Sequence, residues 1–172
     1  MTDGMYRIRR AELADLETLV AFTLEGARDA VGEECDLDAV RRGVGVGLED
    51  PSVATYWVAE DPEGEIVASA SVVKEWSDWH GGYYWWVQSM FIVAEHRGRG
   101  LVDLLLDTIA EAARAVGALD LRLYAHQLNQ RALKAYHRCG FSKSPYVIMT
   151  RPLNGDSWVV DAARSGRVIG RP

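Results

Sequence analysis

One short stretch of the chain combines residue types that bind anions. Residues 92–102 pass from an apolar run to a turn of two arginines and two glycines, Arg97–Gly100, before a helical pattern begins at Leu101. A helix start presents unpaired backbone N–H groups and the positive end of the helix dipole, and glycine lets the backbone approach a phosphate closely. The stretch predicts a cradle for the pyrophosphate of a nucleotide-like cofactor. The alternative is an ordinary strand-to-helix loop with a basic rim.

A second group of residues shares one face of a later helix. Asn129, Ala132 and Tyr136 are spaced by three and four residues, and the pattern ends at Gly140. The Asn129 side chain can hydrogen-bond a ligand at the helix start, and the Tyr136 phenol can donate a proton. The alternative is a capping residue, a small packing residue and a half-buried tyrosine.

Composition limits the class of protein. The chain has 172 residues, 48% hydrophobic and 26% charged, which favours one soluble globular domain. Its net charge of −6 argues against a nucleic-acid partner. The two cysteines, Cys35 and Cys139, form no CxxC pair and no metal-ligand spacing with the histidines, so we expect no metal. Without a long apolar run or a signal-like start, we expect no membrane association and a cytoplasmic location.

Helical and strand-like patterns follow one another in an order that indicates the fold class. Strands are expected at residues 6–10, 56–60, 66–74, 83–93, 119–124 and 145–152, and helices at 11–30, 37–48, 101–116 and 129–139. The turn residues Asp61–Gly64 join the second and third strands as a hairpin. The order predicts a mixed α/β domain with one core sheet.

Taken together, the two motifs resemble those of the GCN5-related N-acetyltransferase (GNAT) superfamily. The pyrophosphate motif of that family, Arg/Gln-x-x-Gly-x-Gly/Ala, is similar to Arg97–Val102, and its motif Asn-x-x-Ala-x-x-x-Tyr-x-x-x-Gly-Phe is matched throughout by Asn129–Phe141. The resemblance covers about residues 5–153, so we expect a domain over residues 1–153 and a C-terminal extension over 154–172. It implies a twisted, splayed mixed sheet of about six to seven strands flanked by about four helices.

The resemblance also implies a reaction, the direct transfer of an acetyl group from acetyl-CoA, a co-substrate, to a primary amine of a small molecule or protein. Tyr136 would act as general acid on the thioester sulfur, and Asn129 would contact the pantetheine. The central strand would supply backbone groups to the pantetheine, and the turn and helix start would hold the pyrophosphate. The implied cofactor-binding residues are Met90, Phe91, Ile92, Arg97, Gly98, Arg99, Gly100, Leu101, Val102, Asp103, Asn129 and Tyr136.

The chain departs from the family pattern where a base is needed. The two positions at which relatives carry a glutamate are Gln88 and Tyr124 here, and Gln88 can orient a water but cannot accept a proton. His126 has the best intrinsic pKa for a base and lies between the two motifs. Its alternative is an exposed loop histidine, and an acceptor amine of low pKa would need no base. Further candidates are Asp78, His80, Glu33 and Glu34.

The acceptor site and the role of the protein stay open in the sequence. Tyr84 and Trp86 fall on one face of a strand and are candidate substrate-lining residues, which Trp76 and Trp79 could join; the alternative is core packing. The missing carboxylate keeps a non-catalytic acyl-CoA-binding module for sensing or assembly as the alternative function. The tail could add a strand, cover the cleft or form a homodimer.

Overall fold

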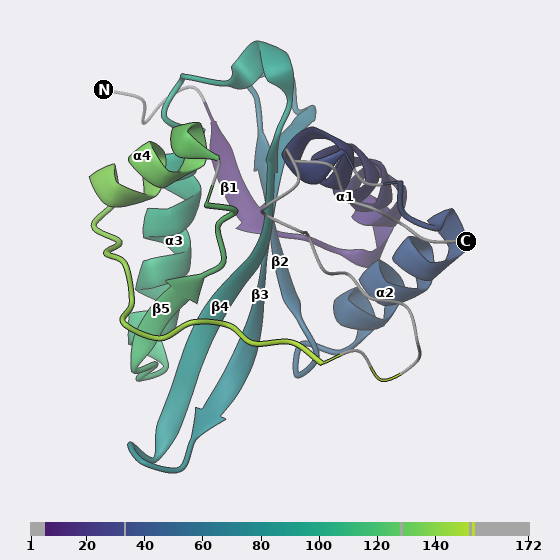
Figure 1. Cartoon of the computed structure of the whole chain (residues 1–172). Helices are drawn as coiled ribbons and strands as arrows, with labels where there is room; N and C mark the ends of the chain where they lie inside the picture. The colour runs from purple at the N-terminus through teal and green to yellow at the C-terminus, as the bar shows by residue number, and fades with distance from the viewer. Residues whose placement is uncertain (1–5, 33, 128, 152, 154–172) are drawn as a thin grey trace.

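The computed structural model describes residues 6–32, 34–127, 129–151 and 153, which form one sheet with helices on both faces (Figure 1). The described strands lie in the order β1-β2-β3-β4-β5, with β4 and β5 parallel and the other neighbours antiparallel. The strands are β1 (Arg7–Arg10), β2 (Thr55–Glu60), β3 (Ile66–Ser77), β4 (Gly82–Ile92) and β5 (Asp120–Leu123). The helices are α1 (Leu16–Val31), α2 (Leu37–Glu49), α3 (Leu101–Ala115) and α4 (Gln130–Arg138), with 3-10 turns at Leu13–Asp15 and Ala94–His96. The mixed α/β class is confirmed.

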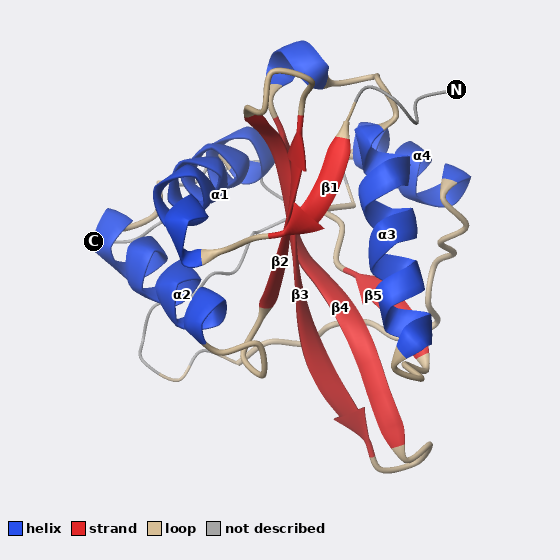
Figure 2. Cartoon of the chain, turned by 180° about the vertical axis from the view of Figure 1, so that it is seen from behind, coloured by secondary structure: helices blue, strands red, loops and turns tan. Residues whose placement is uncertain are grey.

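Two apolar clusters hold the layers together. Helices α1 and α2 cover one face of the sheet, and α3 and α4 lie on the other (Figure 2). In α3, Leu101, Leu105 and Ile109 recur every four residues and are at most 2% exposed, so this stripe packs against the strands. On the opposite face, Leu19 of α1 and Val44 of α2 pack against Val58. The first cluster includes Leu101, so it holds the start of α3 against the sheet.

The first half of strand β4 pairs with a strand on each side, and its second half pairs with β3 alone among the described strands. The strand pairs with β5 from Tyr84 to Val87 but with β3 from Gly82 to Ile92. A β-bulge falls at this point, because Val87 faces Val72 and Ser89 faces Ser71, which leaves Gln88 as the extra residue. Within the described residues, the sheet therefore opens between β4 and β5 directly after Val87.

The β3–β4 hairpin is longer than the sequence predicted. β3 continues three residues past Lys74 to Ser77, where it pairs with Gly82. The hairpin projects beyond the ends of β1 and β2, at the bottom of Figure 1. Its tip is thus far from the point at which β4 and β5 separate.

The strand expected at residues 145–152 is a wrong prediction for its described part. Residues 141–151 form no regular element, and the side chains of Tyr146–Met149 are 66–89% exposed. β-Branched and aromatic residues favour a strand, but a strand forms only where a neighbouring strand can pair with it. The described residues thus contain five strands and not the expected six to seven. The predicted extension, 154–172, lies outside the described residues.

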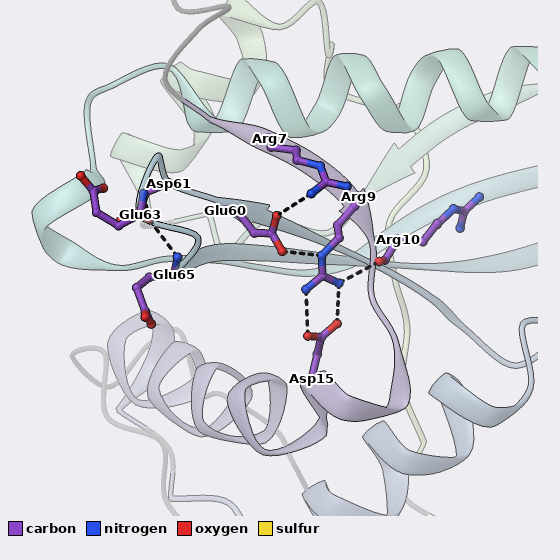
Figure 3. A network of polar contacts seen from close by, with 8 residues as sticks. All are labelled: Arg7, Arg9, Arg10, Asp15, Glu60, Asp61, Glu63 and Glu65. Atoms are coloured by element: carbon purple, nitrogen blue, oxygen red, sulfur yellow. Dashed lines mark hydrogen bonds and ion pairs between the residues drawn. The ribbon is translucent and has the colours of Figure 1, made fainter.

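An ionic network ties β1 to β2 and to the start of α1 (Figure 3). The Arg9 guanidinium donates to Glu60 at 2.6 Å and to both Asp15 oxygens at 2.7 and 3.0 Å. Asp15 also accepts the backbone N–H of Glu12 at 2.8 Å, and it is 8% exposed. The hydrogen bond from Arg9 is the main reason that the pKa of Asp15 lies below its usual value, while burial opposes that shift.

Candidate active site

The predicted anion cradle forms a hollow at the start of α3. Gly98 and Gly100 have φ angles of 79° and 83°, a left-handed conformation that favours glycine. Gly100 is the N-cap of α3 and has no side chain to bond the amides of the first turn. A cavity of about 310 Å³ lies here, lined by Ile92, Gly98, Gly100, Leu101, Val102, Asp103 and Arg138. Six of these seven residues were candidates from the sequence.

Arg138 is a member of this hollow that the sequence reasoning missed. Its guanidinium donates to Asp103 at 3.1 and 2.8 Å, and the Cys139 thiol donates to the same carboxylate at 3.3 Å. The Arg138 hydrogen bond lowers the pKa of Asp103, so this carboxylate stays ionised and paired. The pair fixes the end of α4 to the start of α3 and balances a negative charge beside the cradle. No local pattern marks it, because the partners are 35 residues apart.

The two arginines of the turn differ in their surroundings. The Arg97 guanidinium donates to Asp29 of α1 at 2.6 Å and to the Ile92 carbonyl at 2.8 Å. Arg97 therefore connects the end of β4 to α1. Arg99 is exposed and makes no hydrogen bond or ion pair with any described residue.

The end of β4 offers backbone groups on the open side of the sheet. Met90, Phe91 and Ile92 pair with β3 but lie beyond the last β4–β5 pair. The Phe91 side chain is buried and faces Phe22 of α1, with ring centroids 4.8 Å apart. Since alternate residues of a strand direct their N–H and C=O groups to opposite edges, part of this backbone faces the gap.

Helix α4 carries the second predicted pair. The Asn129 Oδ1 accepts the Ala132 N–H at 3.0 Å, which confirms the cap and leaves its NH₂ group without a described partner. Tyr136 is partly buried, and its ring meets Phe141 edge to face at 6.0 Å. Burial, with a smaller contribution from Cys139, raises the pKa of the Tyr136 phenol above its ordinary value, so the phenol is protonated at neutral pH.

The candidate bases differ in their distance from the point where β4 and β5 separate. Gln88 is exposed at the bulge where β4 and β5 part. His126 follows β5 in the chain, and its carbonyl accepts the Asn129 N–H at 2.8 Å. Asp78 and His80 sit instead at the β3–β4 turn, about 20 Å along β4 from Gln88 at the usual rise per residue.

The remaining candidates lie in the α1–α2 connection. Glu34 is exposed there, and Glu33 lies outside the described residues. The His80 Nδ1 lies 2.9 Å from the Tyr84 hydroxyl, within hydrogen-bond distance, at the base of the hairpin turn. The gap itself is therefore bordered by Gln88 and by the chain that follows β5.

Tyr84 and Trp86 of β4 lie in an aromatic and charged cluster that extends from β3 to the end of β5. The Trp86 ring stacks on Tyr124 at 4.5 Å, and its Nε1 donates to Glu75 at 2.5 Å. The Arg122 Cζ lies 3.3 Å from the Tyr84 ring centroid. Glu75 and Arg122 were missed, because only the strand register brings them to this face.

The two other candidate tryptophans, Trp76 and Trp79, do not join this cluster. Trp76 makes an edge-to-face contact with Tyr83 at 5.0 Å, and Trp79 is 83% exposed at the hairpin turn. Trp85, next to Trp86, is buried in the α3 core at 3% exposure.

The family follows from a comparison with known proteins. Residues 14–141 match the family model described as the acetyltransferase (GNAT) family. The chain belongs to this family. Its members are acyltransferases, and their fold uses acetyl-CoA, so the predicted enzyme class is confirmed.

Individual relatives agree with this assignment. The chain is 28% identical to N-acetyltransferase 8 of Rattus norvegicus over 63% of its own length and 46% of that protein's. It is 27% identical to the L-methionine sulfoximine/L-methionine sulfone acetyltransferase of Pseudomonas aeruginosa over 80% of each chain. Among solved structures, a possible acetyltransferase from Clostridium difficile 630 superposes with a TM-score of 0.81 at 27% identity, covering 87% of this chain and 98% of that one.

Two further observations concern membranes and metals. None of the helices in the described part of the chain has both the length and the apolar character that a membrane crossing requires. In that same part, no three His, Cys, Asp or Glu side chains are grouped as metal ligands would be.

Proposed function

We propose that the chain is an acetyl-CoA-dependent N-acetyltransferase that transfers the acetyl group directly to a primary amine of a small molecule or protein. One observation carries the proposal. The sheet opens after Val87, and the hollow at the start of α3 and the Asn129–Tyr136 face of α4 both belong to the elements that follow this opening. A cofactor with an anionic end and a reactive end would place its anionic end in the hollow and its reactive end beside the Asn129–Tyr136 face.

For binding, the amides from Gly98 to Asp103 would hold the pyrophosphate, with Arg99 and Arg138 as nearby positive charges. Val102 stands where the family has glycine or alanine, but its side chain packs against the α3 core. Its backbone amide therefore remains usable. The backbone of residues 90–92 and the Asn129 NH₂ group would hold the pantetheine.

For catalysis, the neutral amine would attack the thioester carbonyl carbon, and the C–S bond would break as the intermediate collapses. The sulfur would take the Tyr136 proton, and the proton lost by the amine would leave through water oriented at Gln88. The product is an amide and free CoA thiol. Tyr136 recovers its proton from solvent.

The deciding experiment is a calorimetric titration with acetyl-CoA and with CoA, followed by thiol release across a panel of primary amines. Saturable binding with amine-dependent thiol release supports the proposal, and the best amine names the acceptor. Saturable binding without thiol release by any amine favours the non-catalytic acyl-CoA-binding module. The observation behind that alternative is the glutamine at position 88, where relatives carry a carboxylate. Absence of acetyl-CoA binding by the folded chain would overturn both.

The cradle can be tested with a charge at Gly98. Gly98→Asp should raise the Kd for acetyl-CoA by about tenfold or more, because a carboxylate would face the phosphates. Gly98→Asn is the matched control, since asparagine tolerates the left-handed conformation equally well and adds no charge. Calorimetry at two salt concentrations measures both variants. Equal Kd values for the two variants would place the pyrophosphate elsewhere.

The missing carboxylate can be restored at the bulge. Gln88→Glu should raise kcat/KM at pH 7 by about tenfold, because a carboxylate could then take the amine proton, directly or through water. The pH profile should also gain an ionisation below neutrality. An unchanged rate and pH profile would mean that another group, such as His126, already serves as base or that none is needed.

A further inference from the structure

A second and larger hollow lies at the other end of the molecule. It measures about 830 Å³ and opens between the β3–β4 hairpin and the C-terminal ends of α2 and α3. Its walls include Arg10, Lys74, Trp76, Tyr83, Trp85 and Val116. Helix α3 runs about 22 Å from Leu101 to Ala115 (Figure 1). Leu101 lines the cradle and Val116 lines this cavity, so the two hollows lie near opposite ends of that helix.

Two cationic residues that line this cavity lie over aromatic rings of the core. Trp85, 3% exposed, contributes to the lining, and Trp57 is buried beneath the Arg10 guanidinium, with the two ring centroids 6.1 Å apart. The Arg10 Cζ lies 3.7 Å from the Trp57 centroid, and the Lys74 Nζ lies 5.6 Å from the Trp85 centroid. These cations are thus held against aromatic rings while their polar hydrogens stay available.

The charge of the cavity is opposite to that of the chain. The chain carries 25 Asp and Glu residues against 19 Lys and Arg, yet no described residue that lines this cavity is acidic. Within the described residues, neither Arg10 nor Lys74 has a carboxylate within ion-pair distance, although the adjacent Arg9 has two. Two uncompensated cations in an acidic protein favour an anionic ligand.

The wall also sets the shape of the ligand. In the strand register, Arg10 of β1 pairs with Trp57 of β2, and Trp57 pairs with Ala70 of β3. Lys74 is four residues further along β3. The two cationic residues are therefore about 13 Å apart along the strands and about 10 Å apart across them at the backbone. A volume of about 830 Å³ is that of a small-molecule site. Trp76 and Tyr83, 57% and 47% exposed, offer further aromatic surface at the rim.

We propose that this cavity is a second ligand site, separate from the acetyl-CoA cradle, that takes an elongated organic anion with a flat aromatic body. The exposed rings of Trp76 and Tyr83 would contact the flat body, and Arg10 and Lys74 would contact the negatively charged groups. The proposal does not depend on acetyl transfer, because no residue assigned to the cofactor lines this cavity.

The test uses the full chain and a fluorescent aromatic sulfonate, 1-anilinonaphthalene-8-sulfonate, beside its uncharged analogue N-phenyl-1-naphthylamine. The sulfonate should bind saturably. Arg10→Gln and Lys74→Gln should each weaken it about three- to fivefold, and the double variant more than tenfold, with the uncharged analogue unaffected. Trp76→Ala should weaken both probes.

Arg28→Gln is the matched control, since it removes one exposed positive charge from α1, away from the cavity. It should leave the sulfonate affinity unchanged, and saturating acetyl-CoA should not displace the probe. Circular dichroism of each variant confirms that it is folded. An unchanged affinity in the folded Arg10 and Lys74 variants, or displacement of the probe by acetyl-CoA, would overturn the proposal of a separate anion site.

Discussion

Replacing Tyr136 by phenylalanine is expected to lower kcat by about 10²-fold to 10³-fold while changing the affinity for acetyl-CoA by less than about twofold. The substitution removes one hydroxyl and keeps the ring that contacts Phe141. That hydroxyl makes no hydrogen bond with any described residue, so its removal breaks none within the described part of the chain. The expected loss therefore reflects the proton that the departing thiolate no longer receives.

Steady-state thiol release and calorimetry with acetyl-CoA separate the two effects. Tyr146→Phe is the matched control, because Tyr146 is 79% exposed on the segment after α4. The raised pKa of Tyr136 also predicts that its ionisation lowers the rate at a higher pH than the ionisation of an ordinary tyrosine would. An unchanged kcat would show that solvent protonates the thiolate, and a rise in Kd that accounts for the whole loss would give Tyr136 a binding role.

Features that depend only on residues close together in the sequence were predictable. The glycines of the cradle, the start of α3 at Leu101 and the Asn129 cap depend on backbone geometry within a few residues, and the structure places them where the sequence indicated. The aromatic face of β4 was only half predictable. Alternation correctly put Trp85 and Trp86 on opposite faces, but the bulge at Gln88 interrupts it.

Features that depend on distant partners were not predictable. The Asp103–Arg138 pair joins two helices, and the partners of Trp86 come from β3 and from the residue after β5. The strand expected at residues 145–152 failed for the same reason, since its pattern is strand-like but no described strand lies beside it.

Asp15→Asn is expected to cost about 3 kcal/mol of unfolding free energy, the lower range for removing one partner of a buried ion pair. Asp15 is buried and joins Arg9 of β1 to the start of α1, so the variant would leave the Arg9 guanidinium paired with Glu60 alone. For a domain of this size the Tm should fall by about 6–12 °C. Thermal and urea unfolding at pH 7 measure the change.

The pH dependence gives this prediction its sign. The pKa of Asp15 is lowered in the folded state, so its stabilisation is fully present above its unfolded pKa of about 3.9 and is lost as the pH falls through the folded value. The difference between wild type and Asp15→Asn should therefore be constant near neutrality and shrink below about pH 4. Asp38→Asn, which changes a carboxylate whose side chain is 79% exposed, should cost less than about 0.5 kcal/mol. A similar loss in both variants would show that the Arg9 network does not hold β1 against α1, since burial is what distinguishes the two carboxylates.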